Sequence, residues 1–191
     1  MKCMMCENYS PTHICPSCQT NFLSPSLYKR QLANGIEVYS FYKYSEIKEL
    51  LFTKHTDLGF YIYTILAKNA FTPFAEAFSW KEKLVALAID DNIKSGYSHT
   101  AILNKALKSK HIKPLYTKLR AKNSVNYSGK TRAFRVANPR NFVMKDFSEQ
   151  DVILVDDIIT TGTTLTQACQ TVQNKGKEVL FCLTLADVEK K

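Results

Sequence analysis

Apolar and polar residues follow several different patterns along this chain, and each pattern predicts a different element. Short uninterrupted apolar runs at residues 83–90 (KLVALAID) and 152–155 (VILV) are typical of parallel strands that are covered on both faces. Apolar residues recur at helical spacing from Leu58 to Leu66, which indicates a helix facing the core. Residues 36–42 are rich in β-branched and aromatic side chains and predict a further strand.

The remaining predicted elements alternate between helices and strands. They are a helix that Ser45 caps and that runs through Leu51, a helix at residues 100–108, a strand at 111–119, a strand at 134–136, a helix at 163–174 and a strand at 179–185. Such alternation predicts an α/β fold with a mostly parallel sheet, right-handed crossovers and helices on both faces.

The length and composition allow one main core. A chain of 191 residues, 45% of them hydrophobic, suits one α/β domain with a small appendage, which we place at residues 1–24 in front of a domain at residues 25–191. The N-terminus has no sustained apolar stretch, so a secretory signal is not expected. The longest apolar stretch, residues 58–67, is too short for a transmembrane segment. We expect a cytoplasmic protein, with peripheral attachment to the inner membrane left open.

Four of the six cysteines are concentrated in the first eighteen residues. They form two C-x-x-C pairs, Cys3 with Cys6 and Cys15 with Cys18. Four thiolates suit a tetrahedral site for structural zinc (Zn²⁺), and iron in a rubredoxin-like site is the alternative. The metal would fold a segment too short to bury its own core, while a contact role for the tips of the two pairs stays open. We expect His13, between the pairs, to be a loop residue rather than a ligand.

The apolar run at residues 152–155 leads into a polar turn. Asp156 and Asp157 follow the strand, and a hydroxyl-rich turn then enters the next helix. Ligands of open α/β sheets bind at this edge, and the N–H groups of a helix N-terminus suit a phosphomonoester. A carboxylate can accept hydrogen bonds from both vicinal hydroxyls of a sugar, so the pattern indicates a phosphorylated ribose. The residues of the turn are Thr160, Thr161, Gly162, Thr163 and Thr164.

Residues 152–164 (VILVDDIITTGTT) resemble the phosphoribosyl pyrophosphate (PRPP) fingerprint of type I phosphoribosyltransferases. The resemblance implies that Asp156 and Asp157 hold the ribose 2- and 3-hydroxyls, that residues 160–164 hold the 5-phosphate, and that magnesium (Mg²⁺) bridges ribose and pyrophosphate. With a four-cysteine segment in front, the chain further resembles the ComF family, competence proteins of bacteria that take up DNA. The implied fold is a Rossmann-like type I phosphoribosyltransferase domain with a small N-terminal zinc ribbon.

One loop departs from the pattern of the ComF family. Its members carry Arg-Gly-Phe-Asn-Gln in the loop that meets pyrophosphate, whereas this chain has Ser-Gly-Tyr-Ser-His at residues 95–99. The arginine is absent, and Lys94 is the candidate to replace its charge. His99 is considered as a general base but is expected to be structural. The candidates for this pyrophosphate loop are Asp90, Asp91, Lys94, Ser95 and Gly96.

Residues 120–141 form a basic segment, and residues 119–136 (LRAKNSVNYSGKTRAFRV) resemble a shortened form of the family's basic loop. Lys130, Arg132 and Arg135 are candidates for covering the pyrophosphate. A solvated surface and a nucleic-acid patch are the alternatives for these side chains. The net charge of +9 agrees with any of these anionic partners and does not choose among them.

Three functions follow from these features. The first is a PRPP-binding competence protein of natural transformation, which binds single-stranded DNA and assists its import together with inner-membrane DNA-uptake machinery. The second is a phosphoribosyltransferase of nucleotide salvage that transfers ribose 5-phosphate from PRPP to an unidentified acceptor. The third is a zinc-containing assembly module with a vestigial fingerprint. We rank the first ahead of the second because neither a base-recognition hood nor a general base is identified in the sequence.

Overall fold

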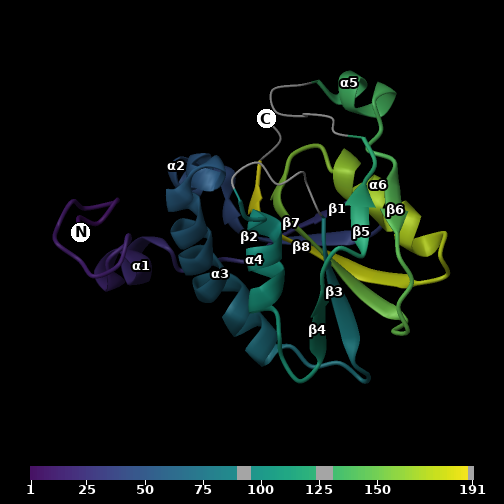
Figure 1. The fold of residues 1–191 in the computed structure, drawn as a ribbon, viewed down its shortest axis with the longest axis horizontal. Helices are drawn as coiled ribbons and strands as arrows, with labels where there is room; N and C mark the ends of the chain where they lie inside the picture. Colours follow the sequence, from purple (N-terminus) through teal and green to yellow (C-terminus); the bar gives the residue numbers. More distant parts are fainter. Residues whose placement is uncertain (90–95, 124–130, 189–191) are drawn as a thin grey trace.

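A six-stranded sheet forms the centre of the molecule (Figure 1), in the order β1-β2-β8-β7-β3-β4. The computed structural model describes residues 1–89, 96–123 and 131–188. The edge strand β1 pairs antiparallel to β2, and all other neighbours in this sheet are parallel, which confirms the mostly parallel α/β prediction. The strands are β1 (Tyr28–Gln31), β2 (Glu37–Lys43), β3 (Leu84–Ala88), β4 (Ile112–Leu115), β7 (Asp151–Ile159) and β8 (Glu178–Asp187).

Helices cover both faces of the sheet. One face packs against α2 (Tyr44–Leu51), the short η1 (Phe52–His55), α3 (Asp57–Ala77) and α4 (His99–Ala106), and the other packs against α6 (Thr163–Gln173). The central strand β7 divides its side chains between the two cores, because successive residues of a strand point to opposite faces. Ile153 and Val155 join the core beside α3, whereas Val152 and Leu154 join the core beside α6.

A separate hairpin lies against α6 and differs from the prediction in two ways. The strand expected at residues 111–119 is two strands in different sheets, β4 and β5 (Leu119–Ala121), because Thr117 takes a positive φ of 56° between them. The strand expected at residues 134–136 is wrong, since that segment is the helix α5 (Arg132–Ala137). Its N-cap Thr131 accepts a hydrogen bond from the Phe134 backbone N–H at 3.2 Å. Strand β5 pairs antiparallel with β6 (Phe142–Met144).

The start of α2 is also corrected. The helix begins at Tyr44 with Lys43 as its N-cap, so Ser45 lies inside the first turn rather than at the cap. The Lys43 backbone N–H donates to Oε2 of Glu46 at 2.8 Å, as in a capping box. If Ser45 were the cap, this N–H group would lie outside the helix.

The four-cysteine segment packs directly on the main core. Cys3 and Cys18 belong to the same buried cluster as α3, and the ring of His13 lies 4.6 Å from that of Tyr61 on α3. The hydroxyl of Tyr42 donates to the carbonyl of Leu23 at 2.8 Å, just after α1 (Pro16–Phe22). The appendage therefore shares its apolar core with the large domain. None of the helices in the described residues is long and apolar enough to cross a membrane.

Candidate functional site

The carboxyl end of β7 carries two buried acids, and Asp157 faces the side of α3 and α4. Its Oδ2 lies 3.0 Å from Nζ of Lys54 in η1 and accepts a hydrogen bond from the Tyr63 hydroxyl at 3.4 Å. Nε2 of His99, at the start of α4, lies 3.4 Å from the same oxygen. Three elements that are distant in sequence thus converge on one carboxylate.

The charges around Asp157 favour its ionised form. Burial opposes ionisation, but at the low pH where Asp157 titrates the protonated His99 ring and the Lys54 ammonium outweigh it and hold the pKa of Asp157 below its usual range. Burial also lowers the pKa of His99, so this ring is neutral at neutral pH. For Lys54, burial disfavours the charged ammonium, yet the Asp157 carboxylate overcomes it and raises the pKa of the lysine. Lys54 is therefore the cation that keeps Asp157 charged.

Asp156 occupies a different environment. Its Oδ1 accepts a hydrogen bond from the Asp157 backbone N–H at 2.8 Å, and its charged neighbours are Asp157 and Arg140. Burial first, and the adjacent Asp157 carboxylate second, raise the pKa of Asp156 to about 8. At neutral pH Asp156 is thus a protonated carboxyl that can donate as well as accept a hydrogen bond.

The turn after β7 forms an open helix N-terminus. Gly162 is the N-cap of α6 with a φ of 78°, a region that favours glycine, and a Cβ there would lie 2.7 Å from Cδ2 of Leu32. The hydroxyls of Thr161 and Thr163 lie 2.9 Å apart. Among the residues that the structure describes, none accepts a hydrogen bond from the backbone N–H of Thr164. This turn therefore presents amide and hydroxyl donors to an anion.

Arg30 holds this turn from the edge strand β1. Its guanidinium donates to the carbonyl of Thr160 at 2.8 Å and to Oδ1 of Asp187 at 2.6 Å. The arginine thereby ties the phosphate turn to the end of β8. The sequence offered little to find Arg30, because the segment around it mixes polar and aromatic residues and contains no motif.

The pyrophosphate-loop and basic-loop candidates are only partly placed. Gly96 is exposed with a φ of 76°, next to Tyr97, whose hydroxyl donates to the carbonyl of Lys54 at 2.7 Å. The backbones of Arg132 and Arg135 lie in α5, and their side chains are outside the described part of the chain. The candidates that lie wholly outside the described residues are Asp90, Asp91, Lys94, Ser95 and Lys130.

The four N-terminal cysteines form a second site. The sulfur atoms of Cys3, Cys6, Cys15 and Cys18 all lie within 4.8 Å of one another, and those of Cys6 and Cys15 are 3.7 Å apart. A tetrahedron with Zn–S bonds of about 2.3 Å has S–S edges of about 3.8 Å, so the donor set fits zinc. Backbone N–H groups of Cys15 and Cys18 donate to the sulfurs of Cys3 and Cys15 at 3.3 and 3.4 Å. The cluster could therefore hold a metal ion such as zinc.

The chain is similar to a known protein family and to several solved structures. A family model of phosphoribosyltransferase (PRTase) type, PRTase-CE, matches residues 20–190, and no curated protein matches the chain. A solved hypoxanthine phosphoribosyltransferase from Staphylococcus aureus is 18% identical with a TM-score of 0.41, and the match covers 65% of this chain and 62% of that one. An orotate phosphoribosyltransferase from Aeropyrum pernix is 15% identical with a TM-score of 0.41, over 90% and 80% of the two chains. An adenine phosphoribosyltransferase is 17% identical with a TM-score of 0.43, over 90% and 89%.

The family model extends from α1 into the last residues and so includes every strand of the central sheet. The sheet is mostly parallel, the acid pair lies in the carboxyl half of β7, and the glycine turn connects β7 to α6. The chain therefore belongs to the PRTase-CE family and has a type I phosphoribosyltransferase fold with a cysteine cluster at its N-terminus.

Proposed function

We propose that the protein binds PRPP together with Mg²⁺ at the junction of β7 and α6. One observation carries this proposal. A buried acid pair is followed closely by a glycine turn, and the backbone N–H groups of that turn form the N-terminus of a helix. The 5-phosphate binds to the donors of residues 160–164, and the ribose 2- and 3-hydroxyls bind to Asp156 and Asp157. Asp157 accepts as a carboxylate, whereas Asp156 can also donate because it is protonated at neutral pH.

Two basic side chains, Arg30 and Lys54, have different roles at this site. Arg30 holds the turn through the Thr160 carbonyl, and Lys54 neutralises Asp157 so that an anionic ligand does not meet an uncompensated carboxylate. Mg²⁺ would supply charge neutralisation for the pyrophosphate when bound, and the carboxyl oxygens of Asp156 and Asp157 are donors of the kind it prefers. In a transfer reaction, the bond between ribose C1 and pyrophosphate would break, and the acceptor would approach from the opposite side.

Ligand-dependent stability tests PRPP binding. PRPP with Mg²⁺, at one hundred times its dissociation constant, should add about 2.7 kcal/mol to the free energy of unfolding of the intact chain. Ribose 5-phosphate, which lacks the pyrophosphate, is the matched control and should stabilise less. If PRPP left the unfolding transition unchanged at millimolar concentration, the site assignment would be wrong.

We further propose that PRPP binding serves DNA uptake, with single-stranded DNA and inner-membrane machinery as partners and the protein attached peripherally at the cytoplasmic side. The net charge of +9, the four-cysteine cluster and the resemblance to competence proteins support this role. Binding of single-stranded DNA should weaken steeply as salt rises, because phosphate contacts release counterions. Absence of DNA binding at low salt would contradict it.

Phosphoribosyl transfer in nucleotide salvage is the second candidate, and the family match favours it. It predicts pyrophosphate release from PRPP in the presence of one purine or pyrimidine base. A panel of free bases, followed with a pyrophosphate assay, separates this role from binding alone. Binding of PRPP without turnover of any base would leave the DNA-uptake role as the better account.

A further inference from the structure

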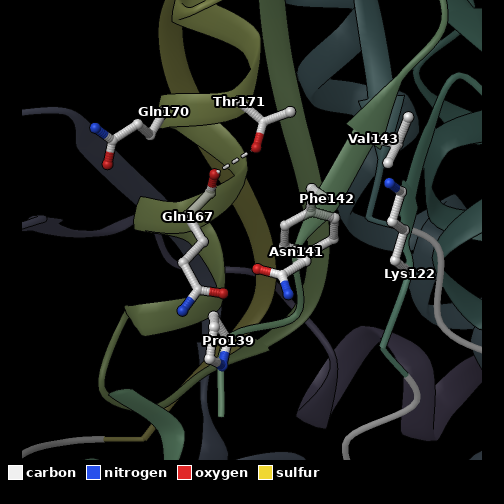
Figure 2. Close-up of a pocket in the computed structure, with 8 residues that line it drawn as sticks. All are labelled: Lys122, Pro139, Asn141, Phe142, Val143, Gln167, Gln170 and Thr171. Carbon is white, nitrogen blue, oxygen red and sulfur yellow. Dashed lines mark hydrogen bonds between the residues drawn. The ribbon is translucent and has the colours of Figure 1, made fainter. Parts of the chain in front are cut away.

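A pocket of about 310 Å³ lies between α6 and the β5–β6 hairpin (Figure 2). Its volume is at the lower end of the range of small-molecule sites. Two amide side chains face each other in it, those of Asn141 and Gln167, together with the ring of Phe142 and the side chain of Lys122. The PRPP proposal uses none of these side chains.

The walls of this pocket are held in place by the surrounding structure. Oε1 of Gln167 accepts a hydrogen bond from the Arg140 backbone N–H at 3.1 Å, which ties the segment before β6 to α6. Phe142 is only 9% exposed because it packs into the core beside α6. Asn141 takes a left-handed φ of 49°, a conformation that asparagine tolerates better than most residues. In Figure 2 its amide lies at the mouth of the pocket, opposite Gln167.

The chemistry of the lining selects one class of ligand. An amide side chain presents a donor and an acceptor in one plane, which matches the edge of a nucleobase. The ring of Phe142 supplies an apolar surface beside these amides, and a base has an apolar face of similar kind. No acidic side chain lines the pocket among the described residues, and Lys122 is its one cation there. A cationic ligand is therefore disfavoured, and a simple anion would find a single charged partner.

We propose that this pocket binds the base of a nucleotide, with the amides of Asn141 and Gln167 on the base edge and Lys122 on the phosphate. Gln167 follows Thr163 by about one turn of α6. At 1.5 Å per residue it lies about 6 Å along the helix from Thr163. The pocket is thus a neighbour of the phosphate turn but is built from different side chains, so the proposal does not depend on PRPP binding.

Calorimetric titration of the intact chain with AMP, GMP, CMP and dTMP, and with an eight-nucleotide single strand, tests this proposal. Gln167→Glu keeps the oxygen that accepts from the Arg140 backbone N–H and removes the amide donor. Asn141→Gly removes the other amide while it keeps the left-handed backbone. Each variant should weaken nucleotide binding about ten-fold, the scale of one lost recognition contact. Gln173→Glu makes the same chemical change at an exposed position of α6 outside the pocket and should leave binding unchanged.

The outcomes distinguish a free nucleotide from nucleic acid as the ligand, and this pocket from the proposed PRPP site. Equal affinity for mononucleotide and strand identifies a free nucleotide as the ligand, whereas binding of the strand alone identifies nucleic acid, and both support the pocket. Absence of binding of both the mononucleotides at millimolar concentration and the strand overturns it, as does an equal effect of Gln167→Glu and Gln173→Glu. Asp156→Asn should weaken PRPP binding and leave nucleotide binding intact. If Asp156→Asn removed nucleotide binding as well, the nucleotide would occupy the PRPP site and the pocket assignment would be wrong.

Discussion

Near the end of β7, two neighbouring aspartates on opposite faces of the sheet differ in their protonation state. On the face covered by α3 and α4, Asp157 meets Lys54 at 3.0 Å and stays ionised. On the other side, Asp156 is equally buried, has Asp157 as its nearest charge and holds its proton at neutral pH. Adjacent residues of one strand therefore differ in charge because their partners differ, and the acid pair is buried with a single negative charge.

The largest expected effect tests the protonated state of Asp156. Its folded pKa of about 8 lies above the value in the unfolded chain, so the unfolded state alone loses this proton between about pH 4 and pH 8. The stability that the protonated group contributes is complete below pH 4 and is lost as pH rises through 8. Asp156→Asn cannot ionise, so its free energy of unfolding should rise relative to that of the wild type by about 1.4 kcal/mol per pH unit across this window.

Chemical denaturation of both proteins at several pH values measures this difference. The gap should level off above about pH 8, where the folded wild type also loses its proton. A difference that stayed constant from pH 5 to pH 8 would show that Asp156 has an ordinary pKa. Ionisation of Asp157 runs in the opposite direction, since its depressed pKa contributes stability above about pH 4 that is lost as pH falls through the folded value.

Removing the cation on the other face should have the next largest effect. Lys54→Met leaves the buried Asp157 carboxylate without its charged partner, and breaking such a pair costs about 3 kcal/mol of unfolding free energy. Lys48→Met is the matched control, because Lys48 is exposed and its pair with Glu49, at 3.8 Å, is on the surface. Urea denaturation at pH 7 should separate the two variants, and equal small losses would mean that Lys54 does not compensate Asp157.

The smallest effect concerns Arg140, which favours the ionised form of Asp156 from a distance. Arg140→Gln should raise the pKa of Asp156 further, because it removes the positive charge that partly offsets burial. The stability difference from Asp156→Asn would then level off at a higher pH than in the wild-type background. A lower levelling point would indicate that Arg140 acts on Asp156 in some other way than through its charge.

Local patterns in the sequence predicted the elements around this site well. The apolar run at residues 152–155, the turn at residues 160–164 and the helix after it all appear in β7 and α6, because buried strands and glycine turns have strong local preferences. The partners of Asp157 could not be predicted in this way. Lys54 and Tyr63 are 103 and 94 residues away in sequence, and only the packing of η1 and α3 on the sheet brings them to β7.

The strand predicted at residues 134–136, where the structure has helix α5, was wrong for a different reason. Residues 134–136 contain aromatic and β-branched side chains that suggested a strand, but the threonine before the helix caps it and decides the local structure. The division into residues 1–24 and 25–191 stays a prediction, although Cys3 and Cys18 share the core of α3. Short segments with metal ligands carry little apolar periodicity, so their packing on a larger domain is hard to predict from sequence.

Calorimetric titration with PRPP, with and without Mg²⁺, tests the central claim most directly when wild type is compared with the double variant Asp156→Asn and Asp157→Asn. The two asparagines keep the shape of the acids and remove their capacity to ionise. We predict Mg²⁺-dependent binding by the wild type at pH 7, where Asp157 accepts as a carboxylate and Asp156 is a protonated carboxyl that can also donate. The double variant should bind at least one hundred-fold more weakly, by about 2.7 kcal/mol. Unchanged PRPP affinity in the double variant would contradict the assignment of the acid pair to the ribose.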